Sequence, residues 1–218
     1  MKLTLVAWLV IGGAVMAHAQ NRFGFEQDAV GQPPAGFAFS VTGNAAPGTW
    51  VIVQDDVPGR GHVLAQTSAA GRGSRFPMAI AQGVLAADVD VSVKMKPVSG
   101  AEDQAGGLVW RYQDPNNYYI VRANALEGNV VVYKVERGRR VDLPVNGQGR
   151  TYGKKAEVPS GRWSDLRVVA TGSRFEVFWN GAPLFEVDDT TFTAAGKVGV
   201  WTKADSVTSF DDLSVVVK

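Results

Sequence analysis

Short apolar or alternating segments recur along this chain, and this pattern constrains its fold more than any other feature of the sequence. Gly, Pro, Asn and Asp residues separate the segments, and helical periodicity is almost absent. The predicted strands are residues 50–54, 62–67, 88–96, 106–113, 117–124, 129–136, 163–171, 174–180, 183–188, 196–202 and 209–217. Asn180-Gly181 predicts a tight hairpin, because both central residues of a type I′ turn need positive φ. More than ten short strands in roughly 200 residues, with no helix, predict an all-β sandwich of two sheets.

Alternation along the predicted strands assigns side chains to the core or to the opposite face of a sheet. The predicted core rows are Val89, Val91, Val93 and Met95; Tyr119, Val121 and Ala123; and Val198, Val200 and Thr202. The opposite rows are Asp90, Ser92, Lys94 and Lys96; Tyr118, Ile120, Arg122 and Asn124; and Gly199, Trp201 and Lys203. One sheet is therefore predicted to present a broad face of Arg, Lys, Asn and aromatic residues, although a slip of one residue would invert each row. Residues 37–49 and 68–82 are predicted to be long irregular segments.

The segment Gly106–Arg140 carries many more polar and aromatic residues than a core requires. Its chemistry-bearing side chains are Trp110, Arg111, Tyr112, Asp114, Asn117, Tyr118, Tyr119, Arg122, Asn124, Glu127, Asn129, Tyr133 and Lys134. Aromatic rings stack on the apolar faces of pyranoses, and amides, guanidinium groups and carboxylates bond to sugar hydroxyls. Two interpretations stay open at this point: a sugar-binding surface, or an amphipathic sheet with a solvated outer face.

Residues 1–19 have the features of a secretory signal peptide. Lys2 supplies the charge, Leu3–Met16 the short apolar run, and Ala17-His18-Ala19 the cleavage site before Gln20. We therefore expect the protein to be secreted or periplasmic, with no membrane span after signal cleavage. A retained signal anchor is the alternative, against which the Ala-His-Ala site argues. Residues 20–218 are predicted to form a single domain, because they contain no repeat and no linker.

Composition excludes several classes of function. The chain has no cysteine, which rules out thiol catalysis, cysteine-ligated zinc and disulfides. Removal of residues 1–19 leaves His62 as the only histidine, and we interpret it as a structural residue. The 21 basic residues that then remain balance the 21 acidic ones, so charge gives no reason to expect nucleic acid or an anionic membrane as a partner. We expect no organic cofactor.

Three stretches carry a resemblance to a known superfamily. They are Asn21–Phe37, Ser99–Arg140 and Val158–Val215, and the most specific parts are NGAPLFEVDDTTFTAAGKVGVWTKAD (Asn180–Asp205) and the terminal FDDL. The chain resembles the concanavalin A-like lectin/glucanase superfamily in its laminin-G-like branch, close to bacterial secreted proteins with a 3-keto-disaccharide hydrolase domain. The resemblance implies a jelly roll of two curved antiparallel sheets, with glycan bound on the concave face. Because the superfamily contains enzymes, lectins and adhesion modules, fold alone does not decide function.

The residues leave enzyme activity open. Family 16 glycoside hydrolases of this superfamily use an E-x-D-x-E strand motif, in which two carboxylates flank the scissile bond. Glu186-Val187-Asp188 matches its first half, but Asp189-Thr190 follows and the second glutamate is absent. The 3-keto-disaccharide branch would need a base and often a metal, and none of its catalytic residues can be assigned to a position in this chain.

The superfamily also implies a structural calcium ion, usually near the chain termini. Calcium takes six to eight oxygen ligands. Glu26 and the Asp211-Asp212 pair are the candidate ligands, because the first and last strands of such a fold commonly pair. A solvated or salt-bridged Asp-Asp is the alternative interpretation.

The sequence therefore predicts a secreted jelly-roll protein that binds an oligosaccharide or polysaccharide on its concave face. Trp110, Tyr118 or Trp201 would stack on the sugar; Arg122, Asn124, Lys203 and Asp205 would bond hydroxyls; Arg111 and Asn117 would shape the rim. Glu127, at the tip of a predicted hairpin, completes the set of candidate binding residues. Two alternatives remain: a glycoside hydrolase or lyase that acts on a (3-keto-)disaccharide, and a laminin-G-like adhesion module that binds protein.

Overall fold

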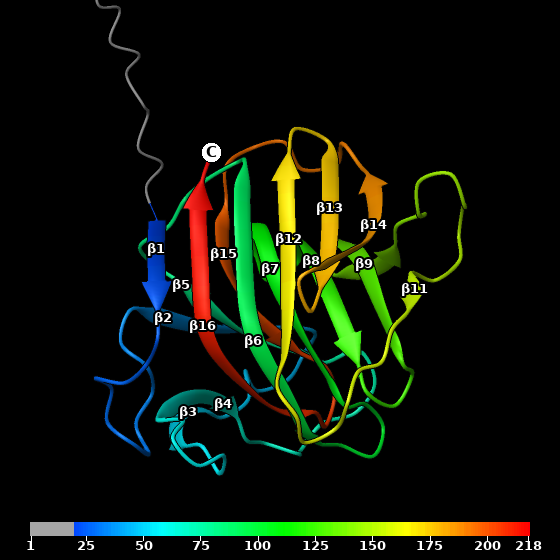
Figure 1. Ribbon diagram of the computed structural model, residues 1–218. Helices are drawn as coiled ribbons and strands as arrows, with labels where there is room; N and C mark the ends of the chain where they lie inside the picture. Colours follow the sequence, from blue (N-terminus) through cyan, green and yellow to red (C-terminus); the bar gives the residue numbers. More distant parts are fainter. Residues whose placement is uncertain (1–19) are drawn as a thin grey trace, which may run out of the picture.

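A computed structural model of the protein describes residues 20–218, which form two antiparallel sheets of eight strands each, packed face to face (Figure 1). This arrangement confirms the predicted all-β sandwich. The predicted signal peptide, residues 1–19, lies outside the described residues. Among the residues that the structure describes, no helix is long and apolar enough to cross a membrane.

Sheet A contains the first and last strands of the described chain. Its strands, in spatial order, are β14 (Ala182–Asp188), β13 (Arg174–Trp179), β12 (Ser164–Thr171), β6 (Val89–Ser99), β16 (Val207–Val217), β4 (His62–Gln66) and β3 (Trp50–Gln54). β1 (Gln20–Phe23) pairs with β16, with Gln20 opposite Val216. The expectation that the two terminal strands pair is therefore confirmed.

Sheet B contains most of the candidate site. Its strands, in spatial order, are β10 (Arg139–Asp142), β9 (Asn129–Glu136), β8 (Asn117–Asn124), β7 (Ala105–Asp114), β15 (Lys197–Thr202), β5 (Phe76–Ala81) and β2 (Phe37–Thr42). The short β11 (Lys154–Lys155) pairs with the start of β9. β2 and β5 correct the expectation of irregular structure at residues 37–49 and 68–82. β5 reads FPMAIA and all six of its residues are buried, so it has neither the polar alternation nor the proline-free sequence that marks a strand.

The main core lies between the two sheets and has the predicted composition. All four apolar residues of the predicted β6 row are buried in it, together with Tyr119, Val121 and Ala123 of β8 and both valines of the β15 row. The Asn180-Gly181 hairpin between β13 and β14 is also confirmed, since both residues have positive φ. Alternation therefore predicted correctly which side chains face the opposite sheet.

A second apolar cluster covers the outer face of sheet B, the face that points away from sheet A. It consists of Phe76, Met78, Ile80, Ala105, Val109, Tyr118, Ile120, Val131, Tyr133, Val135 and Trp201, all 2 % exposed or less. The predicted direction of Tyr118, Ile120 and Trp201 is therefore correct, but the predicted exposure of this face is wrong. The physical reason is coverage by other parts of the chain. The Arg140 side chain lies over the rings of Phe76, Tyr133 and Trp201, and the Thr42 hydroxyl bonds that of Tyr118 at 2.8 Å.

Arg111 clamps the two sheets together. It lies at a register shift in β7 and has a positive φ of 46°. Its guanidinium donates to the carbonyls of Ala87 (2.7 Å), Phe192 (2.8 Å) and Gly172 (2.6 Å), and to Asp88 Oδ1 at 3.1 Å. The prediction that Arg111 shapes a binding rim is wrong, because its side chain is 1 % exposed and its donors are engaged within the protein.

We predict that Arg111→Met lowers the free energy of unfolding by roughly 3 kcal/mol or more, because three backbone carbonyls and a carboxylate lose a donor that is itself fully buried. Urea denaturation measures this change. Arg174→Met is the matched control: Arg174 pairs with Glu186 but its side chain is 55 % exposed, so the expected loss is much smaller than for Arg111→Met. Equal, small losses for both variants would show that Arg111 is not a clamp.

Candidate functional site

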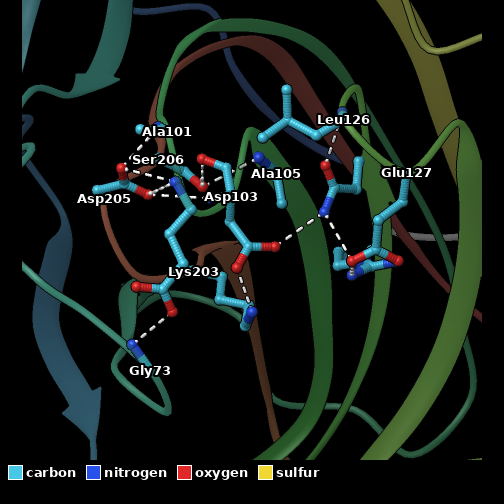
Figure 2. Close-up of polar contacts among 12 residues, drawn as sticks. Gly73, Ala101, Asp103, Ala105, Leu126, Glu127, Lys203, Asp205 and Ser206 are labelled. Atoms are coloured by element: carbon cyan, nitrogen blue, oxygen red, sulfur yellow. Dashed lines mark hydrogen bonds and ion pairs between the residues drawn. The ribbon is translucent and has the colours of Figure 1, made fainter.

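Five polar residues converge at one end of sheet B; we call them the acid–amide cluster: Asp103, Arg122, Asn124, Glu127 and Lys203. Arg122 and Asn124 lie at the end of β8, and Glu127 lies in the hairpin that leads to β9. Asp103 precedes β7 and Lys203 follows β15, so three separate segments of the chain contribute. Figure 2 shows Asp103, Glu127 and Lys203 from these segments close together. Four of the five were predicted as binding residues, and Asp103 was not. Arg122 and Asn124 are buried, which corrects their predicted contact with sugar hydroxyls.

A forked ion pair between Arg122 and Glu127 forms one half of the acid–amide cluster. Arg122 Nη1 donates to Glu127 Oε1 at 2.9 Å, and Nη2 donates to Glu127 Oε2 at 2.8 Å and to Asn129 Oδ1 at 2.6 Å. The Arg122 side chain has no exposed area, whereas 34 % of the Glu127 side chain is exposed. A buried cation is thus held by a carboxylate that still reaches solvent, and both partners have fixed orientations.

Asn124 joins this ion pair to a second one. Its Nδ2 donates to Glu127 Oε1 at 3.0 Å and to Asp103 Oδ1 at 2.8 Å, while its Oδ1 accepts the backbone N–H of Leu126 at 2.9 Å. The other oxygen of Asp103 accepts from Lys203 Nζ. A continuous chain of charged hydrogen bonds therefore runs from Lys203 to Arg122, and it orients every member before any ligand arrives.

The electrostatics of the acid–amide cluster keep Glu127 ionised. Burial acts to raise the pKa of Glu127, but the hydrogen bonds and positive charge of Arg122 outweigh it and hold that pKa below its usual range. Burial likewise acts to lower the pKa of Arg122, and Glu127 more than compensates for it. A general acid needs a carboxyl whose pKa is raised towards neutrality. Glu127 has the opposite shift, so it is built to accept hydrogen bonds and not to donate a proton.

Asp205 organises the loop beside the acid–amide cluster. Its carboxylate accepts the backbone N–H groups of Ala101 (2.6 Å), Glu102 (3.0 Å) and Asp103 (3.0 Å), as Figure 2 shows. Burial acts to raise the pKa of Asp205, but these backbone donors lower it overall. The structure therefore gives Asp205 a positioning role towards Asp103. A cavity of about 290 Å³ adjoins it, lined in part by Arg72, Glu102 and Asp205.

The three aromatic rings predicted to stack on a sugar are all fully buried, which corrects that prediction. Trp110 faces sheet A and packs with Tyr119 at a centroid separation of 5.5 Å. Tyr118 and Trp201 face outwards but lie beneath other side chains, and Trp201 Nε1 donates to the Tyr118 hydroxyl at 3.4 Å. No face of these rings is open to a ligand.

Asn117 also differs from its prediction as a rim residue. Its Nδ2 donates to both carboxylate oxygens of Asp114, and its Oδ1 accepts the backbone N–H of Arg137 at 3.1 Å. It thus fastens the β7–β8 hairpin to the β9–β10 hairpin. It lies at the opposite end of β8 from the acid–amide cluster.

Tyr152 is the exposed aromatic residue that the sequence reasoning missed. It is 42 % exposed and its ring centroid lies 5.9 Å from that of Tyr133 and 5.7 Å from Arg122 Cζ. It has a positive φ of 56° in a loop whose glycines 147, 149 and 153 share that conformation. The sequence NGQGRTYGKK contained the signal, because a single aromatic residue among turn glycines indicates a ring displayed on a loop.

The proposed calcium ligands have protein partners in the structure. Asp211 Oδ2 pairs with Arg60 at 2.7 Å, and Glu26 Oε2 accepts the backbone N–H of His62 at 3.2 Å. Asp212 is exposed and follows Asp211 at a register shift of β16. Within residues 20–218, no three acidic or histidine side chains are grouped as metal ligands. Calcium binding stays a prediction.

Comparison with known proteins supports the fold. No family model matches the sequence, and no curated protein matches it. A carbohydrate-binding module CBM66 from Bacillus subtilis is 18% identical, with a TM-score of 0.60 over 80% of this chain and 92% of that chain. Domain 4 of AbnA, an extracellular arabinanase of Geobacillus stearothermophilus solved with arabinotriose, is 18% identical, with a TM-score of 0.54 over 90% of each chain.

A Bacillus subtilis protein of unknown function, described as having a galectin-like fold, is 11% identical, with a TM-score of 0.55 over 93% of this chain and 100% of that chain. These structures share the two-sheet sandwich, so the resemblance to concanavalin A-like proteins is confirmed for the fold. At such low identities they show the fold alone, and the laminin-G-like and 3-keto-disaccharide hydrolase assignment remains a resemblance.

We predict an asymmetry between the two partners of the buried ion pair at pH 7. Glu127→Gln should lower the free energy of unfolding by about 3 kcal/mol, because it leaves the fully buried Arg122 without a counter-charge. Arg122→Met should lower the free energy of unfolding by less than half as much, because the exposed part of Glu127 remains hydrated. The methionine also fills part of the space that the arginine side chain occupied. Urea denaturation of both variants measures the difference.

The same experiment at low pH provides the control. The folded-state pKa of Glu127 is lowered, so its stabilising contribution is complete above the unfolded pKa of about 4.3 and is lost as pH falls through the folded pKa. The stability difference between wild type and Glu127→Gln should therefore shrink at pH 3. A larger loss for Arg122→Met, or a difference that does not change with pH, contradicts this account.

Proposed function

We propose that this protein binds carbohydrate without cleaving it, on the outer face of sheet B between Tyr152 and the acid–amide cluster. One observation carries the proposal: an exposed aromatic ring and a partly exposed carboxylate flank the same buried arginine. The Tyr152 ring lies 5.7 Å from Arg122 Cζ, and Glu127 holds Arg122 through both guanidinium nitrogens. A ring for the apolar face of a sugar thus lies next to oriented groups for its hydroxyls.

The acid–amide cluster is suited to bind sugar hydroxyls because its side chains are already ordered before binding. Asn124, Asp103 and Glu127 are already oriented by their mutual hydrogen bonds. Lys203 and Glu127 remain partly exposed, with 17 % and 34 % of their side chains open to solvent. Binding therefore loses little side-chain entropy, which favours recognition of a polar, weakly hydrophobic ligand.

The electrostatics favour binding over hydrolysis. A retaining or inverting glycosidase needs one carboxyl held protonated as the acid. Glu127 has a lowered pKa, and Asp103 is ion-paired with Lys203. Neither carboxylate of the acid–amide cluster is placed to act as that acid.

An adhesion module would instead show a contiguous apolar surface. The exposed large apolar residues of the described chain are Val30, Val57, Leu85, Val98, Leu126 and Tyr152. They lie in separate loops or strand ends and only Leu126 and Tyr152 are near the site, so this alternative receives no support.

The structural comparisons support the same ligand class through the fold. The similar Bacillus subtilis protein is described as a carbohydrate-binding module, and the similar arabinanase domain was solved with arabinotriose. We further propose that the protein acts outside the cytoplasm, on the basis of the signal peptide predicted at residues 1–19. A soluble glycan of the periplasm or the cell surroundings is then the expected ligand.

Tyr152→Ala tests the proposed site. A glycan array of neutral and acidic oligosaccharides, probed with residues 20–218, should give at least one binder. Against that glycan, Tyr152→Ala should bind about tenfold more weakly, which equals about 1.4 kcal/mol, because the stacking surface is lost. Isothermal titration calorimetry measures the affinities.

Two control variants make the result specific. Tyr152→Phe keeps the ring and should bind almost as wild type. Leu85→Ala removes a side chain that is 68 % exposed in the loop between β5 and β6, and it should have no effect on affinity. An array without any binder would contradict the proposed function, and unchanged binding by Tyr152→Ala would contradict the proposed site.

A further inference from the structure

Arg140 lies on the outer face of sheet B, and its guanidinium is surrounded by aromatic rings. Its Cζ atom lies 4.5 Å from the ring centroid of Tyr133, 4.8 Å from that of Phe76 and 5.8 Å from that of Trp201. The side chain is half-buried, so part of it remains accessible. Three aromatic faces therefore fix the guanidinium in place while it stays in reach of a ligand.

No carboxylate pairs with Arg140 in the described part of the chain. Its Nη1 atom is buried and has no hydrogen-bond partner, and the same is true of Tyr133 Oη and Arg122 Nε. Asp142, two residues further along β10, pairs instead with Arg150 at 2.9 Å. Three polar groups around one tyrosine ring are thus left unsatisfied by the protein itself, which is uncommon for buried groups.

Three other cations of the protein each have a carboxylate partner. Arg122 pairs with Glu127, Lys203 with Asp103, and Arg111 with Asp88. The Cζ atoms of Arg122 and Arg140 lie 5.6 Å and 4.5 Å from the ring centroid of Tyr133. The two positive charges are therefore close together in a poorly hydrated position, where Glu127 supplies one negative charge. An anion beside the accessible part of Arg140 would balance this charge.

We propose that the glycan bound at this site is acidic, and that a sugar carboxylate binds Arg140 while the sugar ring packs on Tyr152. This inference rests on the proposed function and adds the class of ligand to it. Tyr152 and Arg140 both lie against the Tyr133 ring, so this ring links the proposed stacking surface to the proposed anion site. The planar fork of the guanidinium matches the two oxygens of a carboxylate, as found in uronic acids.

Paired ligands test the inference. Calorimetric titrations would use oligosaccharides of galacturonate, glucuronate and mannuronate, each beside its carboxyl-reduced neutral counterpart. We expect at least one acidic form to bind tenfold or more tightly than its neutral counterpart. Arg140→Gln should abolish that preference, and Arg140→Lys should restore only part of it, because lysine keeps the charge but not the fork. Arg139→Gln, an exposed neighbour on β10, should retain the preference.

The outcomes separate the two levels of the proposal. Equal or tighter binding of the neutral forms would overturn the acidic ligand and leave carbohydrate binding intact. The acidic ligand is overturned in the same way if Arg140→Gln remains folded, as thermal melting shows, and keeps a preference for the acid. Binding to sulfated glycans without binding to any uronate would overturn the carboxylate assignment. Absence of binding to every acidic and neutral glycan would refute the proposed function itself.

Discussion

Burial of sheet B on both faces is the constraint on which the rest of this structure depends. One face packs against sheet A, and the other is covered by its own aromatic and arginine side chains. Residues Val130–Tyr133 of β9 are consequently all buried, as in the central strands of doubly covered sheets. Every polar group that such a sheet places on its outer face must find a partner or remain costly. The acid–amide cluster is the result of this requirement at one end of the sheet.

The buried arginines show how partners give the same side chain different roles. Arg111, on β7 of sheet B, donates to backbone carbonyls beside strands of sheet A, so it stabilises the sandwich. Arg122 is held by the partly exposed Glu127, so it orients a group that reaches solvent. Within residues 20–218, Arg140 rests on aromatic rings and has no carboxylate partner, which is why we propose an anion there. Burial alone would not distinguish the three, whereas the acceptors around each guanidinium do.

The sequence predicted the direction of side chains well and their coverage poorly. Alternation placed Tyr119 inside and Tyr118 outside, and both assignments hold. It could not show that Tyr118 is covered, because the covering side chains come from segments far away in the sequence. Arg111 escaped correct assignment because a register shift with positive φ breaks the two-residue period. Tyr152 lies in a loop, where no period exists.

The most direct test of the central claim is an NMR titration of ¹⁵N-labelled protein with the strongest binder from the glycan array. If the outer face of sheet B carries the site, the amide shifts of residues 125–129, 151–153 and 203–206 should change most and saturate together. The open groove on sheet A, lined by Ser92, Arg167 and Ser214, should show no change. Shifts confined to that groove, with the first three segments unaffected, would contradict the account.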